Sequence, residues 1–212
     1  MKPKPLYING RHVGSTSSRG VTNPWNGSHL ANVCLADAAQ VEEAIASAHA
    51  AFQTTRKMTA DARAVILENI AAVIAERRAD FVSTIVAEAG KPVTFAEAET
   101  ERARLTFRFA AALALSDEGH GLAMDASAPG VGHFGLVRRF PIGVILGITP
   151  FNFPLNLVAH KVAPCLATGN TMVLKPSPKT PLSSLLLAEV LDAAGVPPGQ
   201  INVVLFDHEH IP

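Results

Sequence analysis

The alternation of apolar strands with helical segments in the last third of the chain is the feature that most constrains its fold. Strands are predicted at 142–149 (IGVILGIT), 171–174 (TMVL) and 201–205 (INVVL), with helices between them at about 155–168 and 182–194. Strands that are apolar throughout are typical of a parallel sheet that helices cover on both faces. The sequence therefore predicts an α/β fold with βαβαβ units, a Rossmann-like parallel sheet with flanking helices.

Helices are also predicted before residue 120. Asp37 and Gln40 have the spacing of a capping box, and apolar residues recur at helical spacing after them. A second helix is expected from about Asp61 to Gly90, and these two form an N-terminal helical pair. A third helix is expected over about 96–116.

Two hairpins are predicted. Residues 6–13 (LYINGRHV) indicate a short one, because Asn9-Gly10 tolerates the positive φ of a two-residue turn. Residues 121–143 are Gly-rich and strand-prone, and we expect 121–141 to project as a β-hairpin arm.

Composition excludes several classes of partner. The 212 residues are 48% hydrophobic and 17% charged, which suits a folded protein with a sizeable core. Eighteen Lys and Arg balance eighteen Asp and Glu without a run of five like charges, so we expect no nucleic-acid and no membrane partner. The longest apolar stretch is broken by Pro150, well short of a membrane span. Cys34 and Cys165 lack CxxC spacing and have apolar neighbours, which predicts core positions, no metal site and a cytoplasmic location.

Polar side chains follow two of the predicted strands. Asn152 stands between Pro150 and Pro154 after the first strand, and Lys175 ends the second strand before Pro176. Ligands of parallel sheets bind beyond the carboxyl ends of the strands. The Asn152 amide is therefore placed to donate to an oxygen that becomes negative during a reaction, unless it only bonds its own loop. Lys175 is placed to hold a ribose hydroxyl or a phosphate, unless it is simply a solvated lysine.

Other ionisable side chains are further candidates. His160 and Lys161 lie on the helix predicted after the first strand, where one of them is placed to point back toward Asn152. Arg102 and Arg108 on the third helix are interpreted as solvated or anion-binding. The usual GxGxxG dinucleotide fingerprint is absent from the sequence.

The segment TPFNFPLNLVAHKVAPCLATGNTMVLKPSPKTPLSSLLLAEVL (149–191) resembles the aldehyde dehydrogenase superfamily. It has a Pro-aromatic-Asn-Phe-Pro loop, a Lys nine positions after that Asn, an Ala-Pro-x-Leu-x-x-Gly-Asn helix end and a Val-Leu-Lys-Pro-Ser strand end. Upstream, YINGRHV, NPWNG, EAGKP and RRFPIGV follow the family's usual order, so the resemblance covers essentially the whole chain.

The resemblance implies roles for individual positions. Asn152 matches the family's oxyanion-stabilising amide, and Lys175 matches the lysine that binds the adenosine ribose. Lys161 matches a lysine implicated in ordering water and in proton transfer. The cofactor-binding positions that it implies are Ile148, Thr149, Pro150 and Phe151 after the first strand, and Lys175, Pro176, Ser177 and Pro178 after the second.

The resemblance also implies a division of the chain. Residues 1–120 match the N-terminal part of a cofactor-binding domain, 121–141 an oligomerisation arm, and 142–212 the first βαβαβ half of a dinucleotide-binding sheet. The catalytic domain is expected to be missing. A homodimer or homotetramer that acts on a small-molecule aldehyde is implied for the full-length protein.

Two departures from the family pattern matter. Pro178 stands where many NAD-preferring members carry a Glu that binds both ribose hydroxyls. Without that carboxylate a 2′-phosphate meets no repulsion, so we expect NAD or NADP as cofactor. The family's nucleophilic cysteine and glutamate base lie farther along a longer chain, and neither cysteine here matches the nucleophile. We therefore expect the 212-residue chain alone to be inactive.

The leading prediction is NAD(P)-dependent oxidation of an aldehyde to a carboxylic acid, through a cysteine thiohemiacetal in the full-length enzyme. This chain would supply cofactor-binding and oxyanion-stabilising residues. As a further hypothesis, Arg108 and His160 line the aldehyde tunnel and favour an anionic substrate. The alternative is a non-catalytic nucleotide-binding or oligomerisation module, and a third is an unrelated α/β protein with Cys165 as its nucleophile.

Overall fold

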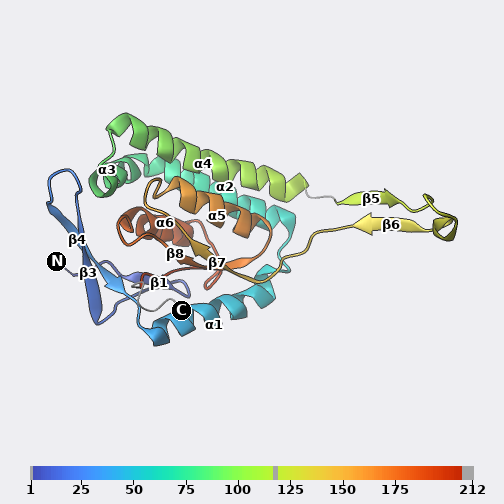
Figure 1. Ribbon diagram of the computed structural model, residues 1–212, viewed down its shortest axis with the longest axis horizontal. Coiled ribbons are helices and arrows are strands. Elements are labelled where there is room, and N and C mark those ends of the chain that lie inside the picture. The colour runs from blue at the N-terminus through green and yellow to red at the C-terminus, as the bar shows by residue number, and fades with distance from the viewer. Residues whose placement is uncertain (1, 117–118, 207–212) are drawn as a thin grey trace.

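A five-stranded sheet forms the centre of the computed structural model, which describes residues 2–116 and 119–206. The strand order is β2-β1-β9-β8-β7 (Figure 1). The strands are β1 (Leu6–Ile8), β2 (Arg11–Val13), β7 (Val144–Ile148), β8 (Thr171–Lys175) and β9 (Ile201–Val203). β7, β8 and β9 are mutually parallel, which confirms the predicted βαβαβ sheet, whereas β1 pairs antiparallel with β9 and β2.

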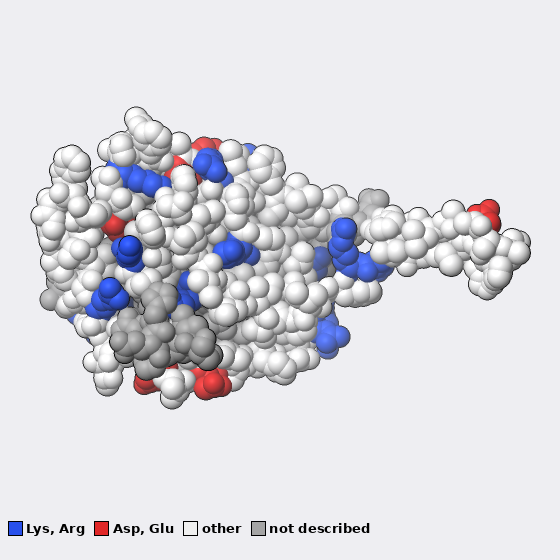
Figure 2. All heavy atoms as spheres, viewed as in Figure 1, with Lys and Arg blue, Asp and Glu red and all other residues white. Residues whose placement is uncertain are grey.

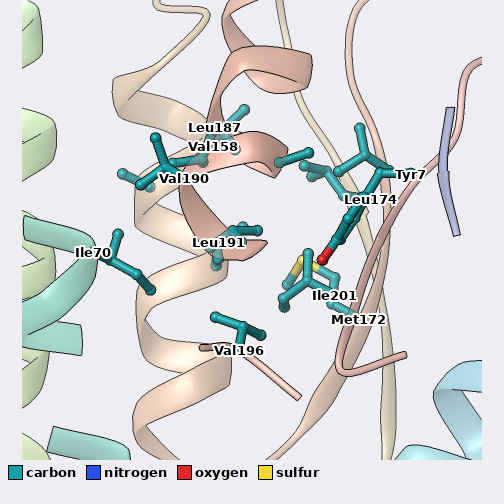
Figure 3. Packing of buried hydrophobic residues seen from close by; sticks show 14 of the residues in the cluster. Tyr7, Ile70, Val158, Met172, Leu174, Leu187, Val190, Leu191, Val196 and Ile201 are labelled. Atoms are coloured by element: carbon teal, nitrogen blue, oxygen red, sulfur yellow. The ribbon is translucent and has the colours of Figure 1, made fainter. Parts of the chain in front are cut away.

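Helices cover both faces of this sheet. α5 (Asn156–Ala167) joins β7 to β8, and α6 (Leu182–Ala193) joins β8 to β9. Both lie on one side of the sheet, and α1 (Ala38–Thr55) lies on the other (Figure 1). Figure 3 shows the buried side chains between the sheet and α6: Tyr7, Met172, Leu174 and Ile201 from the strands, and Leu187, Val190 and Leu191 from the helix.

A second helical layer packs over α5 and α6. It consists of α2 (Ala60–Glu76), α3 (Arg78–Ala89) and α4 (Val93–Ser116). The helix expected from Asp61 to Gly90 is divided at Arg77, whose backbone leaves helical geometry at φ −95° and ψ 20°. The Arg77 guanidinium bonds Glu189 of α6, so a tertiary contact accompanies the break. α3 then ends at Gly90 in the left-handed region, as its glycine predicts.

Three hairpins complete the fold. In the β1–β2 hairpin, Asn9 and Gly10 take the predicted positive φ of 53° and 70°. β5 (His120–Ala123) and β6 (Phe134–Val137), linked through the 3₁₀ helix η1 (Ala128–Gly130), form the predicted arm, which projects from the body in Figure 1. A third ribbon of β3 (Ser17–Thr22) and β4 (His29–Leu35) was not expected from the sequence, because β3 is polar and mostly exposed.

Charged side chains are spread over the visible surface. On the face in Figure 2, Lys and Arg side chains are scattered, with a small group where the arm meets the body, and form no continuous basic stripe. Across residues 2–116 and 119–206, no helix is both long and apolar enough to cross a bilayer. The same residues contain no group of three His, Cys, Asp or Glu with the geometry to hold a metal ion.

The buried carboxylate of Glu99 ties α4 to the start of α5. Glu99 is 1% exposed, and its Oε1 accepts from the backbone N–H groups of Leu155 at 3.0 Å and Asn156 at 3.2 Å. Its Oε2 lies 2.5 Å from Lys91 Nζ. These bonds satisfy N–H groups that a helix N-terminus leaves without an intrahelical partner, and the negative charge complements the helix dipole. Glu99 therefore fixes where the loop after β7 ends.

The buried carboxylate of Glu88 on α3 anchors the start of α6 in the same way. Its carboxylate is 2% exposed and accepts from the N–H of Leu182 at 2.6 Å and of Ser183 at 2.9 Å, and from the Ser183 hydroxyl at 2.5 Å. Burial raises the pKa of Glu88 to about 7, although its hydrogen bonds favour the charged form. The loop after β8 is thus anchored to α3.

We expect Glu99→Gln to lower the free energy of unfolding by about 3 kcal/mol, because it leaves the Lys91 ammonium without its buried charge partner. Urea unfolding measures the change. Glu101→Gln on the same helix is the matched control: Glu101 is 46% exposed and pairs with Arg104, so its loss should cost less than about 1 kcal/mol. Equal costs for the two variants would contradict the anchoring role.

Glu88 should also make stability depend on pH. Its pKa is higher in the folded protein than the ordinary 4.5, so the folded state keeps a proton that the unfolded state releases as pH rises. The favourable contribution is complete below pH 4.5 and is lost as pH rises through about 7, with a span of about 3 kcal/mol. The difference in unfolding free energy between wild type and Glu88→Gln should shrink over this range. A difference independent of pH would refute the assignment.

Candidate functional site

The ends of β7 and β8 bring the two predicted motifs to the same edge of the sheet. In the parallel register Ile148 lies opposite Lys175, and Thr149 N–H donates to Lys175 O at 3.2 Å. Asn152 follows β7 by four residues on the loop that starts there, and Lys175 is the last residue of β8. The carboxyl ends of neighbouring strands therefore carry both candidate residues, as predicted.

Asn152 lies on an exposed loop that is anchored both before and after this residue. Glu99 anchors the loop's end, and the Thr180 hydroxyl donates to Phe151 O at 3.5 Å from the loop after β8. Lys179 Nζ lies 4.6 Å from the centroid of the Phe151 ring. Within the described part of the chain, the Asn152 side chain makes no hydrogen bond, so the alternative that it serves its own loop has no support there.

Lys175 is buried rather than solvated. Its side chain is 2% exposed, and Nζ lies 5.1 Å from the centroid of the Phe206 ring. Pro176 and Ser177 are buried beside it, Pro178 is half-buried, and the Ser177 hydroxyl accepts from Lys179 N–H at 3.2 Å. The simple alternative of a solvated lysine at a strand end is therefore excluded by its burial.

A cavity of about 620 Å³ opens beside Asn152. The loops after β7 and β8 line one side of it, with Phe151, Asn152 and the segment 178–180, and the β3 ribbon and the end of α3 line the other. Lys175 is not among the lining residues, so the cavity adjoins only one part of the predicted cofactor site. The sequence reasoning missed the contribution of β3, which no local motif signals.

Lys161 and His160 do not reach this cavity. Lys161 is half-buried and lies along a separate groove of about 280 Å³ over β7, together with Cys165 one turn later on α5. His160 is exposed on the same helix. Cys165 is 2% exposed, and burial raises its pKa to about 12, which confirms the core interpretation and argues against a nucleophile. Cys34 is likewise buried.

The two arginines of α4 lie in different places. Arg108 is half-exposed, and its Nε lies 4.0 Å from a Glu68 carboxylate oxygen on α2. Arg102, in contrast, has its guanidinium carbon 5.6 Å from the centroid of the Phe153 ring, next to Asn152. The structure thus places Arg102 beside the Asn152 loop and Arg108 beside α2, and the hypothesis that Arg108 and His160 line an aldehyde tunnel stays a prediction.

Comparisons with known proteins identify the family of this chain. The sequence model of the Aldehyde dehydrogenase family matches residues 12–211. A 3-sulfolactaldehyde dehydrogenase from Priestia aryabhattai is 33% identical over 211 residues, covering all of this chain and 44% of that protein. A 4-trimethylaminobutyraldehyde dehydrogenase B from Danio rerio is 38% identical over 189 residues, covering 89% of this chain and 36% of that protein.

A solved dehydrogenase structure is also similar to this chain. The NADP-dependent glyceraldehyde-3-phosphate dehydrogenase from Bacillus halodurans C-125, complexed with NADP, superposes with a TM-score of 0.94 at 33% identity. It is matched over all of this chain and 45% of its own length, so the chain spans less than half of the proteins it resembles. Matched across nearly all of its sequence and fold, the chain belongs to the aldehyde dehydrogenase family.

Proposed function

We propose that this chain forms the cofactor-binding, oxyanion-stabilising portion of an NAD(P)-dependent aldehyde dehydrogenase that produces a carboxylic acid. The observation that carries the proposal is the pairing of β7 with β8, which sets a free carboxamide and a buried ammonium at one edge of a parallel sheet. In the full-length enzyme, a cysteine outside this chain would form the thiohemiacetal. The chain alone would not turn over substrate.

In this proposal the Asn152 amide donates a hydrogen bond to the substrate oxygen as it gains negative charge. Thr149, Pro150 and Phe151, with Ile148 at the strand end, would hold the nicotinamide, and the bound cofactor would supply a hydride acceptor. Because both ends of the Asn152 loop are anchored, the amide needs little rearrangement to meet the oxygen. Lys161 would order water near the reacting carbon.

Lys175, Pro176 and Ser177 would hold the adenosine ribose. Pro178 offers no carboxylate to repel a 2′-phosphate, and the Lys179 ammonium two residues from Ser177 adds positive charge nearby. The NADP complex of the Bacillus halodurans relative supports nicotinamide dinucleotides as the cofactor class. We therefore propose NADP as a cofactor alongside NAD.

We also propose how the chain divides into domains. Residues 1–120 and 142–212 would build the cofactor-binding domain, with 1, 117–118 and 207–212 outside the described residues. On the edge strand β7, Leu146 is 63% exposed and Ile148 is 52% exposed, which suits coverage by a further part of the protein. Both cysteines are free and buried, which suits a reducing compartment such as the cytoplasm.

Nucleotide binding by the 212-residue chain tests the proposal. Lys175→Met keeps most of the side-chain volume but removes the charge, and we expect a loss of NADP affinity of about tenfold or more by isothermal titration calorimetry. Lys57→Met is the matched control, because Lys57 is exposed near the opposite end of the sheet. Equal affinities for wild type and Lys175→Met would remove the ribose role.

Pro178→Glu tests the phosphate preference. The new carboxylate should repel a 2′-phosphate and accept from the ribose hydroxyls of NAD, which shifts the NADP-to-NAD affinity ratio toward NAD by about tenfold. Calorimetric titration of both nucleotides gives the ratio. An unchanged ratio would show that this position does not face the adenosine ribose.

The exposed apolar side chains of the arm support a second proposed role, self-association into a homodimer or homotetramer. Its strands and tip expose apolar side chains well away from the core: Leu122, Val131, Phe134 and Leu136. Exposed apolar patches of this kind mark interaction sites, and a second copy of the chain would cover them. Without the catalytic part, the chain would retain this oligomerising role, which is the non-catalytic alternative.

Sedimentation velocity tests the arm. Phe134→Ser combined with Leu136→Ser should convert an associated species to a monomer, because Phe134 is 83% exposed and would pack only against a partner. Phe109→Ser on α4 is the matched control, since Phe109 is 67% exposed but lies off the arm. Association that survives the double change would place the interface elsewhere.

A further inference from the structure

Trp25 is the most exposed aromatic residue in the described part of the chain, with 85% of its surface open to solvent. It lies in the NPWNG turn (23–27) that joins β3 to β4, and it is the only Trp of the chain. Trp is among the residue types that are highly buried on average, and it is enriched among the residues that dominate the affinity of protein interfaces. A Trp ring left in water therefore marks this turn as a candidate contact surface.

The turn is rigid before any partner binds. Gly27 N–H donates to Asn23 O at 2.8 Å, and Trp25 N–H donates to Asn23 Oδ1 at 2.9 Å. Asn26 Oδ1 accepts from Ser28 N–H at 2.9 Å. A side chain on a fixed backbone loses less conformational entropy on binding than one on a mobile loop. Burial of the Trp25 ring by a partner would therefore be opposed only weakly by the cost of ordering the turn.

A cavity of about 500 Å³ lies beside this turn, between α3 and the start of α4. A Cβ built at Gly90 would lie 3.0 Å from Pro24 Cγ, so the turn packs closely against the end of α3 (Figure 1). Asn23 lines the cavity, but Trp25 does not, and its 85% exposure shows that the ring leaves the cavity of its own chain empty. The apolar walls are Ala79, Val82, Val86, Ala87 and Val93.

A protruding ring and a cavity that lie side by side fit a two-fold contact between two copies. In such a contact both copies use the same surface, so the ring of each can enter the cavity of the other. The rim of the cavity carries one charge of each sign, Arg78 and Glu97, which are 3.3 Å apart and 49% and 40% exposed. Two copies can therefore set Arg78 of one against Glu97 of the other, and the charges of the paired surfaces complement each other.

We propose that Trp25 and this cavity form a self-association site, in which Trp25 of each of two copies enters the cavity of the other. The site lies at the opposite end of the molecule from the β5–β6 arm (Figure 1), and the inference does not depend on the dehydrogenase role. A Trp side chain buries about 150–250 Å², so two rings with their cavity walls fall short of the roughly 1,200 Å² of a stable interface. The contact is therefore weak, with a dissociation constant of about 100 μM.

Fluorescence of the single Trp reports this contact directly. The 212-residue chain with Phe134→Ser and Leu136→Ser, which lacks the proposed arm contact, is diluted from about 500 μM to about 5 μM. At high concentration we expect the emission to shift to shorter wavelength and quenching by acrylamide to fall, because the ring leaves water. Sedimentation velocity over the same range should show a monomer that becomes a dimer.

Variants of the cavity test the same contact while keeping the Trp probe. Val93→Arg fills the cavity from a position that is 55% exposed, and we expect it to abolish the concentration-dependent shift. Glu97→Arg should weaken association about tenfold, and Arg78→Glu combined with Glu97→Arg should restore it. Leu113→Ser is the matched control, because Leu113 is 67% exposed near the other end of α4 and should leave association unchanged.

Two results would overturn the self-association site: Trp emission that does not change with concentration, or a shift of the same size in Val93→Arg. At a few micromolar the contact is dissociated, so the test of the arm can be carried out without it. NADP titration of the same samples separates this inference from the proposed function. A chain that shows the Trp25 shift but does not bind NADP retains the self-association site and counts against the dehydrogenase role alone.

Discussion

Two buried carboxylates anchor the loops that carry the candidate site. Glu99 and Glu88 come from the second helical layer, and each accepts backbone N–H groups at the start of a crossover helix. A helix start buried without such acceptors would lose hydrogen bonds to water without replacement. Each carboxylate also lies at the positive end of a helix dipole, which offsets part of the cost of its burial. The loops after β7 and β8 therefore have fixed ends.

The fixed ends of these loops connect the fold to the proposed oxyanion chemistry. A loop fixed at a strand end and at a helix start has few conformations, and Thr180 and Lys179 link the two loops further through Phe151. Preorganised donors need little reorganisation when charge develops on a substrate. The same carboxylate that anchors the Asn152 loop also pairs with Lys91, whose ammonium lies 3.8 Å from the centroid of the Phe153 ring.

The sequence predicted the features that depend on local pattern. Apolar strands between helices predicted the parallel sheet, and the capping box at Asp37 and Gln40 begins α1 as expected. The break at Arg77 was missed because residues on both sides favour a helix, and the contact that accompanies it, Glu189, is 112 residues away. The helix-anchoring roles of Glu88 and Glu99 were missed for the same reason, since acceptor and donors are far apart in the chain.

Some features of the candidate site could likewise be predicted from the sequence, and others could not. The placement of Asn152 and Lys175 at one sheet edge could be predicted, because strand ends and parallel pairing follow from the pattern. The burial of Lys175, the cavity wall from β3 and the contact of Arg102 with Phe153 depend on how distant elements pack. No local motif carries that information. The functional roles of these residues stay predictions.

The position of a bound nucleotide tests the account most directly. A crystal structure of the chain with NADP should place the adenosine ribose within hydrogen-bond distance of Lys175 Nζ. The nicotinamide should then lie along Thr149, Pro150 and Phe151, with the Asn152 amide free to meet a substrate oxygen. A nucleotide that contacts neither Lys175 nor the segment 149–151 would contradict the account.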